Sequence, residues 1–254
     1  MIARVPTFPL LAAVLAIVGC GHAQAQSAPP KWADTISTEI EKAVRSGDLA
    51  KVQAARALAE RVATAYPDDG LILHYEGFAL YEEAGIRQGR SDGDPNPVLE
   101  RARDLLDRSL KNHPLPETHA LLSSIDGQLI ARDPSRAMEL GMAAQSSMGA
   151  AVSLGPKNPR VWLLRGISTM FTPAEYGGGL KPAEEQIQHA IELFATDKPN
   201  PGEPSWGRAE AYIWLGQLYE KLNDKPKAEA AYKSALQIAP DYRWATMLLA
   251  ALKQ

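Results

Sequence analysis

The sequence is poor in cysteine, in net charge and in long apolar runs. It holds one cysteine, Cys20, which excludes a disulfide within the chain and any zinc site built from several cysteines. Its 27 basic and 30 acidic residues leave a net charge of -3, whereas nucleic-acid-binding proteins usually carry a basic surface. These shortages argue against a disulfide-rich scaffold and against a nucleic-acid partner.

The first residues of the chain are typical of an export signal. The apolar run at 10–18 is far shorter than the roughly 20 residues that span a bilayer as a helix. Two processing routes are open: an A-x-A site at 23–25 predicts a signal peptide 1–25, whereas the sequence 17–20 resembles a bacterial lipobox. The second route gives a lipoprotein signal 1–19 and a membrane tether through a lipidated Cys20. Both predict a periplasmic or envelope-associated protein, soluble or lipid-anchored, with a linker over 26–31.

The rest of the chain, residues 32–254, is predicted to be all-α. Sustained alternation of apolar and polar residues, which would indicate strands, is missing after Pro30. Alanine, leucine, glutamate and lysine instead recur at helical spacing between prolines and glycines. The prediction is a helical domain punctuated by short turns.

A repeat motif near the C-terminus makes this prediction specific. Small residues in this motif let two antiparallel helices approach closely, and large residues fill the space between the helices. The slots are Tyr212, Leu215, Gly216, Tyr219, Ala228, Tyr232 and Pro240. In this pattern the sequence resembles the tetratricopeptide repeat (TPR) family. The resemblance implies a right-handed superhelix of antiparallel helix pairs and a role in binding a protein or peptide partner.

Degenerate repeats extend the pattern toward the N-terminus. A first helix pair is expected over 32–46 and 49–66, and the helix after Pro134 is expected to run toward Leu154, for about eleven helices in all. Insertions are expected near 85–97 and 171–179, and each is either part of a binding surface or a plain connector. The repeat slots are Leu73, Gly77, Leu80, Ala102, Leu106 and Pro114, then Ala120, Ser123, Ser124 and Ala137, then Trp162, Gly166, Ala183, Ile187 and Ala190.

Candidate chemistry is sparse. The spacing of Asp92, Asp94 and Asn96 matches the first ligands of a calcium-binding loop. However, Pro97 occupies the position that requires glycine, and Arg103 occupies the position of the glutamate ligand. The triple glycine at 177–179 lacks the lysine and the preceding strand of a phosphate loop. No cofactor, metal or catalytic residue is therefore predicted, and the chain is expected not to be an enzyme.

A binding groove follows from the resemblance, since the first helix of each TPR pair lines the concave surface. The candidates recur at helical spacing and are Leu71, His74, Phe78, Tyr81, Leu121, Ile125, Arg160, Leu163, Ile167, Met170, Ile213 and Gln217, with Thr118, Gln128, Glu210 and Glu220 in the same phase. An alternative is that some of these side chains are core, covered by degenerate repeats or inserts.

Two functions are weighed on this basis. The first is a non-catalytic scaffold that binds a protein or peptide in the bacterial envelope, because a contiguous exposed apolar surface marks a docking site. The second is a periplasmic small-molecule or lipid-binding accessory lipoprotein of an uptake system. The sequence names no partner.

Overall fold

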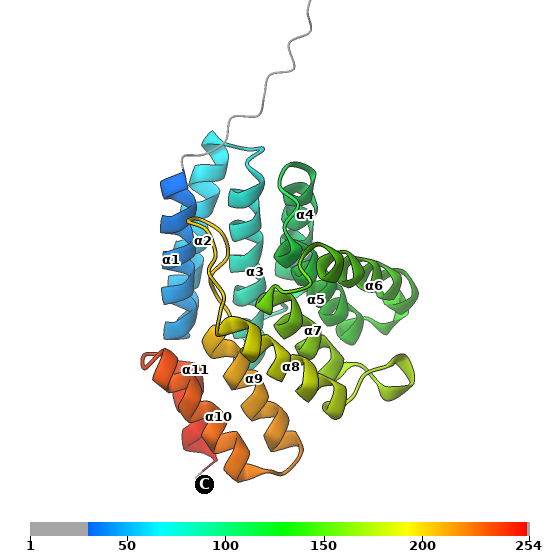
Figure 1. Cartoon of the computed structure of the whole chain (residues 1–254). Coiled ribbons are helices and arrows are strands. Elements are labelled where there is room, and N and C mark those ends of the chain that lie inside the picture. Colours follow the sequence, from blue (N-terminus) through cyan, green and yellow to red (C-terminus); the bar gives the residue numbers. More distant parts are fainter. Residues whose placement is uncertain (1–29, 253–254) are drawn as a thin grey trace, which may run out of the picture.

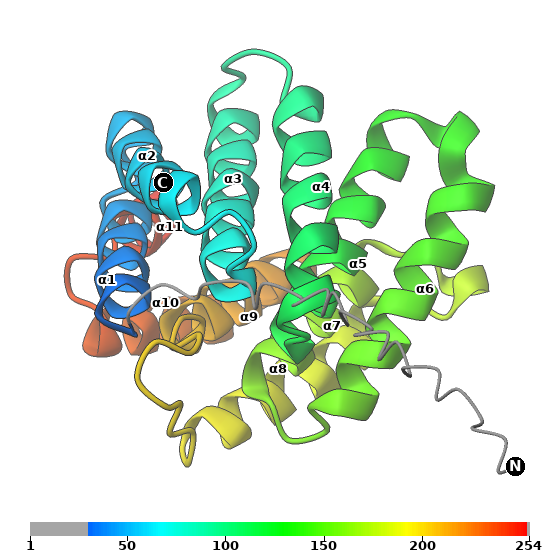
Figure 2. The ribbon, with the colours of Figure 1, turned by 90° about the horizontal axis from the view of Figure 1, so that it is seen from above.

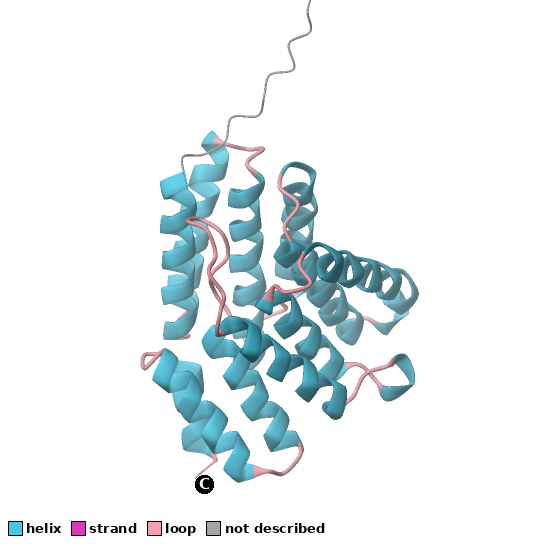
Figure 3. Cartoon of the chain, in the orientation of Figure 1, coloured by secondary structure: helices cyan, strands magenta, loops and turns pink. Residues whose placement is uncertain are grey.

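The computed structural model describes residues 30–252. The predicted signal peptide, Cys20 and residues 26–29 of the predicted linker lie outside that range. Within it, eleven α-helices and two 3-10 turns are joined by loops, and no strand occurs (Figure 3). The helices are α1 (Pro30–Ser46), α2 (Leu49–Ala65), α3 (Gly70–Arg90), α4 (Asn96–Asn112), α5 (Pro116–Arg132), α6 (Ala137–Leu154), α7 (Pro159–Phe171), α8 (Leu180–Phe194), α9 (Arg208–Lys221), α10 (Lys225–Ile238) and α11 (Arg243–Ala251).

Consecutive helices pack as antiparallel pairs. The pairs are α1 with α2, α3 with α4, α5 with α6, α7 with α8 and α9 with α10, and α11 packs on the last pair (Figure 1). The first helices of neighbouring pairs also touch, as α3 with α5, α5 with α7 and α7 with α9. The all-α superhelix of helix pairs expected from the sequence is confirmed.

Helix starts are fixed by local capping. The carboxylate of Asp69 accepts hydrogen bonds from the backbone N–H groups of Leu71 and Ile72, both at 3.0 Å, where α3 begins. Asp48 caps α2 and Asn158 caps α7 in the same way. Such side chains satisfy backbone donors that have no partner within the helix.

A small residue in the first helix lets its partner helix approach. A Cβ atom added at Gly216 would lie 2.3 Å from Cε1 of Tyr232, a distance that real Cβ atoms do not reach. The ring of Tyr232 therefore fills the space that the missing side chain leaves. The same pairing recurs with Gly77 against Leu106 and Gly166 against Ile187.

The two expected insertions behave differently. Around 85–97 the extra length goes mainly into helix, because α3 continues to Arg90 and α4 starts at Asn96. The chain between these two helices is therefore a short connector, 91–95. Around 171–179 the chain does form a loop with a 3-10 turn, Ala174–Tyr176, and Gly177 and Gly179 have φ of 82° and 126°. Glycine adopts these left-handed backbone angles without the strain that a side chain would add.

The two ends of the superhelix meet. Helix α1 contacts α11 (Figure 1 and Figure 2). The Arg45 guanidinium Nε lies 3.3 Å from Oδ2 of Asp241, which precedes α11. The helical array therefore curls round until its first and last helices touch. None of the helices between residues 30 and 252 is long and apolar enough to cross a membrane.

Candidate functional site: the inner face of the superhelix

The inner face, meaning the side of α3, α5, α7 and α9 on which the groove was predicted, is largely closed. Eight of the twelve predicted groove residues are buried, with exposed fractions of 0–7%. They are His74, Phe78, Leu121, Ile125, Arg160, Leu163, Met170 and Ile213. The other four, Leu71, Tyr81, Ile167 and Gln217, are half-buried. The expectation that all twelve line an open groove is therefore corrected, since most of them are core.

The loop between α8 and α9, residues 195–207, covers part of this face. We call it the covering loop. It runs from α8 toward α1 and α3 (Figure 1). The indole ring of Trp206 stacks on Phe78, with ring centroids 4.7 Å apart and planes 14° from parallel. The Tyr75 hydroxyl donates a hydrogen bond of 2.8 Å to the Gly202 carbonyl, and the Ser205 hydroxyl donates one of 2.7 Å to Glu41.

Sequence reasoning missed this loop. The two insertions that it singled out lie inside helix pairs, whereas the covering loop lies between two pairs. A usable indication was present, because Pro199, Pro201, Pro204 and Gly202 fall within one short stretch and interrupt the helical pattern. Sequence alone does not say where such a stretch packs.

A buried arginine holds the base of the covering loop. The guanidinium of Arg160 forms an ion pair with both carboxylate oxygens of Asp197 and lies 3.8 Å from Oε1 of Glu117. The side-chain amide of Asn158 donates a hydrogen bond of 2.6 Å to the same Glu117 oxygen. Burial raises the pKa of Glu117, while the amide and the guanidinium of Arg160 oppose that rise. The charge of Arg160 is thus balanced inside the protein, as a buried ion requires.

His74 is a core residue. Its Nδ1 lies 2.8 Å from the Thr118 hydroxyl, and its Nε2 has no hydrogen-bond partner. Burial, with repulsion from His113 and Arg160, lowers the pKa of His74 to about 3, so the ring is neutral at physiological pH. Within residues 30–252, no three His, Cys, Asp or Glu side chains gather closely enough to hold a metal ion.

An aromatic row remains accessible beyond the covering loop. It consists of Phe171 at the end of α7, Trp214 in α9 and Trp244 in α11. Trp214 makes edge-to-face contacts with Phe171, centroids 6.1 Å apart, and with Trp244, centroids 5.3 Å apart. Phe171 is 59% exposed, both tryptophans are half-buried, and the ammonium of Lys221 lies 5.3 Å from the Phe171 ring. The row is an apolar surface shared by the last two helix pairs and the terminal helix α11.

The predicted groove missed this row by one residue. It included Met170 and Ile213, which are buried, whereas the accessible rings belong to the next residue of each helix. One residue is about 100° around an α-helix, enough to exchange a core position for a surface position. The aromatic residues themselves are visible in the sequence, but the exact phase of the inner face depends on how the pairs are rotated.

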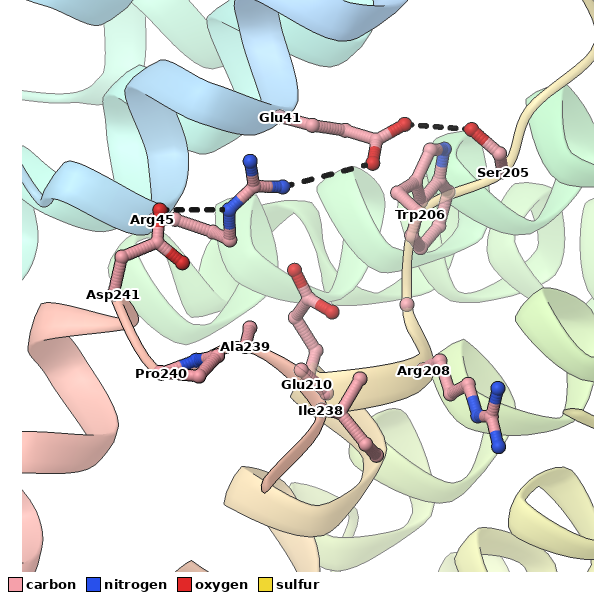
Figure 4. A pocket seen from close by; sticks show the side chains of 12 residues that line it. Glu41, Arg45, Ser205, Trp206, Arg208, Glu210, Ile238, Ala239, Pro240 and Asp241 are labelled. Carbon is pink, nitrogen blue, oxygen red and sulfur yellow. Dashed lines mark hydrogen bonds and ion pairs between the residues drawn. The ribbon is translucent and has the colours of Figure 1, made fainter. Parts of the chain in front are cut away.

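A cavity of about 380 Å³ opens where the ends of the superhelix meet (Figure 4). Its lining residues come from α1, the covering loop, the start of α9, the end of α10 and the turn before α11. Arg45 lies between Glu41 at 4.0 Å and Asp241 at 3.3 Å, so its charge is already paired.

Two acidic side chains near this end of the superhelix have raised pKa values. The Tyr242 hydroxyl donates a hydrogen bond of 3.1 Å to Glu210, whose pKa is raised by burial. Burial and repulsion from Glu210 also raise the pKa of Glu82 to about 8.

Comparison with known proteins agrees with this architecture. The tetratricopeptide repeat family model matches residues 209–242. The HusA haemophore from Porphyromonas gingivalis superposes with a TM-score of 0.62 at 18% identity, covering 76% of this chain and 94% of that one. TTC0263, a thermophilic TPR protein of Thermus thermophilus, gives 0.57 at 20% identity, covering 88% and 98%. No curated protein sequence matches the chain. The family match places a tetratricopeptide repeat at residues 209–242, and both solved structures share the helical superhelix of this chain.

Proposed function

We propose that the protein is a scaffold of the bacterial envelope that binds a segment of a partner protein on the aromatic row. TPR folds are in general protein-interaction modules and not catalysts. The observation that carries the proposal is the cluster of Phe171, Trp214 and Trp244, which leaves apolar rings partly exposed across two helix pairs and the terminal helix. Covering a partly exposed aromatic cluster with a partner is favourable because it removes apolar surface from water. Aromatic side chains are also enriched at protein interfaces.

Site-specific photo-crosslinking tests this proposal. A photo-reactive amino acid is placed at Lys221, which is exposed beside Phe171. The matched control carries it at Lys233, which is exposed on α10. We expect a discrete adduct from position 221 in envelope preparations and none from position 233. The adduct is identified, and the purified partner should bind Trp214→Ala at least about tenfold more weakly, a loss of about 1.4 kcal/mol. Equal adducts from both positions, or unchanged binding by Trp214→Ala, would contradict the proposal.

The envelope location is a separate part of the proposal. It is supported by the export signal in the sequence, with cleavage after Ala25 or lipidation of Cys20 as the two routes. Mass spectrometry of the N-terminus of the cell-fractionated protein distinguishes them, since the first route leaves Gln26 first and the second a lipid-modified Cys20. Under the lipid route, Cys20→Ala should move the protein out of the membrane fraction. An unprocessed chain in the cytosol would be the opposite result.

A second candidate function is the capture of a flat apolar small molecule by the same row. The specific observation in its favour is the pair of half-buried indoles at 5.3 Å, which offers ring surface to a planar ligand. The similarity to a haemophore supports testing haemin as the probe. Absorbance titration with haemin should show a saturable spectral change that Trp214→Ala weakens. A titration identical to that of free haemin in buffer would exclude this candidate for haemin.

A further inference from the structure

The covering loop lies on the inner face as a bound peptide lies in a groove. We propose that residues 195–207 act as an internal ligand, and that an extended partner segment with an acidic and an aromatic residue competes for the same site. We call the residues that receive the loop, Glu41, Tyr75, Phe78 and Arg160, the loop site. The inference goes beyond the proposed function, because it concerns the loop site and not the aromatic row.

The loop is held at a few anchors. Asp197 supplies a carboxylate to Arg160, the Gly202 carbonyl accepts from Tyr75, and Trp206 stacks on Phe78. Between these anchors the chain is exposed at Lys198, Pro199, Asn200 and Pro201, and again at Ser205. It forms no helix, and three prolines restrict its backbone. A separate peptide of the same chemistry could therefore make the same contacts.

Each anchor defines what a competing segment must carry. The buried guanidinium of Arg160 requires a carboxylate, because Glu117 alone meets it only at 3.8 Å. The face of Phe78 accepts a flat ring in parallel stacking. The Tyr75 hydroxyl requires a backbone or side-chain acceptor. The partner chemistry is thus an acidic residue followed, in an extended stretch, by a carbonyl and an aromatic ring.

The seated loop satisfies the site incompletely. The indole Nε1 of Trp206 and the guanidinium Nε of Arg160 are both buried without a hydrogen-bond partner. A buried donor that lacks an acceptor costs free energy, so the loop is held less tightly than its buried area alone would indicate. An external segment that offers an acceptor to Nε of Arg160 would avoid the cost of that unpaired donor. A segment that stacks on Phe78 a ring without an N–H group would avoid the cost of the unpaired indole donor.

Binding of the loop peptide in trans tests the inference. In the full chain, residues 196–206 are replaced by a glycine–serine segment of equal length, which leaves the loop site vacant but the chain connected. A labelled synthetic peptide of residues 195–207 is then titrated and followed by fluorescence anisotropy. We expect saturable binding to the replaced variant and none to the unmodified chain, whose site is filled. Peptides with Trp206→Ala or Asp197→Asn should bind at least about tenfold more weakly, and a scrambled peptide should not bind.

Failure of the peptide to bind at millimolar concentration, with helical circular dichroism unchanged, would overturn the inference. If the replaced variant does not fold, thiol labelling decides instead. In a Cys20→Ala background, a maleimide is used to label Pro204→Cys in the loop and Ala120→Cys in the core of α5, both of which replace buried residues. Labelling at position 204 at least about tenfold faster supports a loop that leaves its site. Equal rates overturn it. Neither measurement involves Trp214 or Lys221, so the outcome is independent of the proposed function.

Discussion

Substituting Gly216 by alanine is the sharpest test of how the repeats pack. The added methyl would lie 2.3 Å from Cε1 and 2.7 Å from Cδ1 of Tyr232, whose ring is fully buried. The Tyr232 hydroxyl donates a hydrogen bond of 2.6 Å to Glu220 of α9, which limits how far the ring can swing away. We therefore expect α9 and α10 to be forced apart.

The magnitude follows from two opposed effects. Alanine is favoured over glycine within a helix by about 1 kcal/mol. Overpacking of a filled core costs about 1–3 kcal/mol, and a weakened hydrogen bond adds about 1 kcal/mol. The net expectation for Gly216→Ala is a loss of about 1–3 kcal/mol in the free energy of unfolding.

Urea denaturation measures this loss, and α6 offers a matched control. A Cβ atom added at Gly149, also inside a helix, would meet nothing within 4 Å. Gly149→Ala should therefore stabilise the chain by up to about 1 kcal/mol. The two substitutions are chemically identical, so opposite signs isolate the clash with Tyr232. If both variants shift the urea midpoint in the same direction by similar amounts, the close approach of α9 and α10 is refuted.

Three further predictions concern ionisable side chains. Arg160→Met leaves Glu117 and Asp197 without their cation and should lower the free energy of unfolding, measured in urea, by about 3–5 kcal/mol. Adding Asp197→Asn to this variant should recover part of the lost stability. Strictly additive losses from the two substitutions would contradict the pairing. The pKa of Glu82 is raised from its ordinary 4.5 to about 8, so the folded chain retains a proton that the unfolded chain releases and stability falls as pH rises through that window. Glu82→Gln should flatten this slope and stabilise the chain by about 1–2 kcal/mol at its upper end, after allowance for partial exposure; an unchanged slope would exclude Glu82 as its source. The pKa of His74 is lowered from 6.5 to about 3, which has the opposite sign: stability falls as pH drops below 6.5, and His74→Asn should flatten that acid limb, whereas a limb as steep as in the unmodified chain would assign it to other groups.

The repeat pattern was readable because it is local. The glycine at 216, the ring at 232 and the proline at 240 lie within one helix pair, and their spacing alone predicts which side chains meet. The extent of the helix after Pro134 was also predictable from local sequence, and the structure gives this helix as Ala137–Leu154. The inner face was harder, since a shift of one residue separates buried Ile213 from half-buried Trp214.

The amino-acid sequence by itself determined the helix pairs, because small and large residues at fixed spacing leave one way for neighbouring helices to dock. Only the tertiary structure decided what happens to the inner face. The covering loop reaches residues far away in the chain, with Ser205 hydrogen-bonded to Glu41 over a separation of 164 residues and Gly202 to Tyr75 over 127. Such contacts depend on the total curvature of the repeats that lie between the contacting residues, and this curvature brings α1 back to α11. A local sequence pattern does not determine that total curvature.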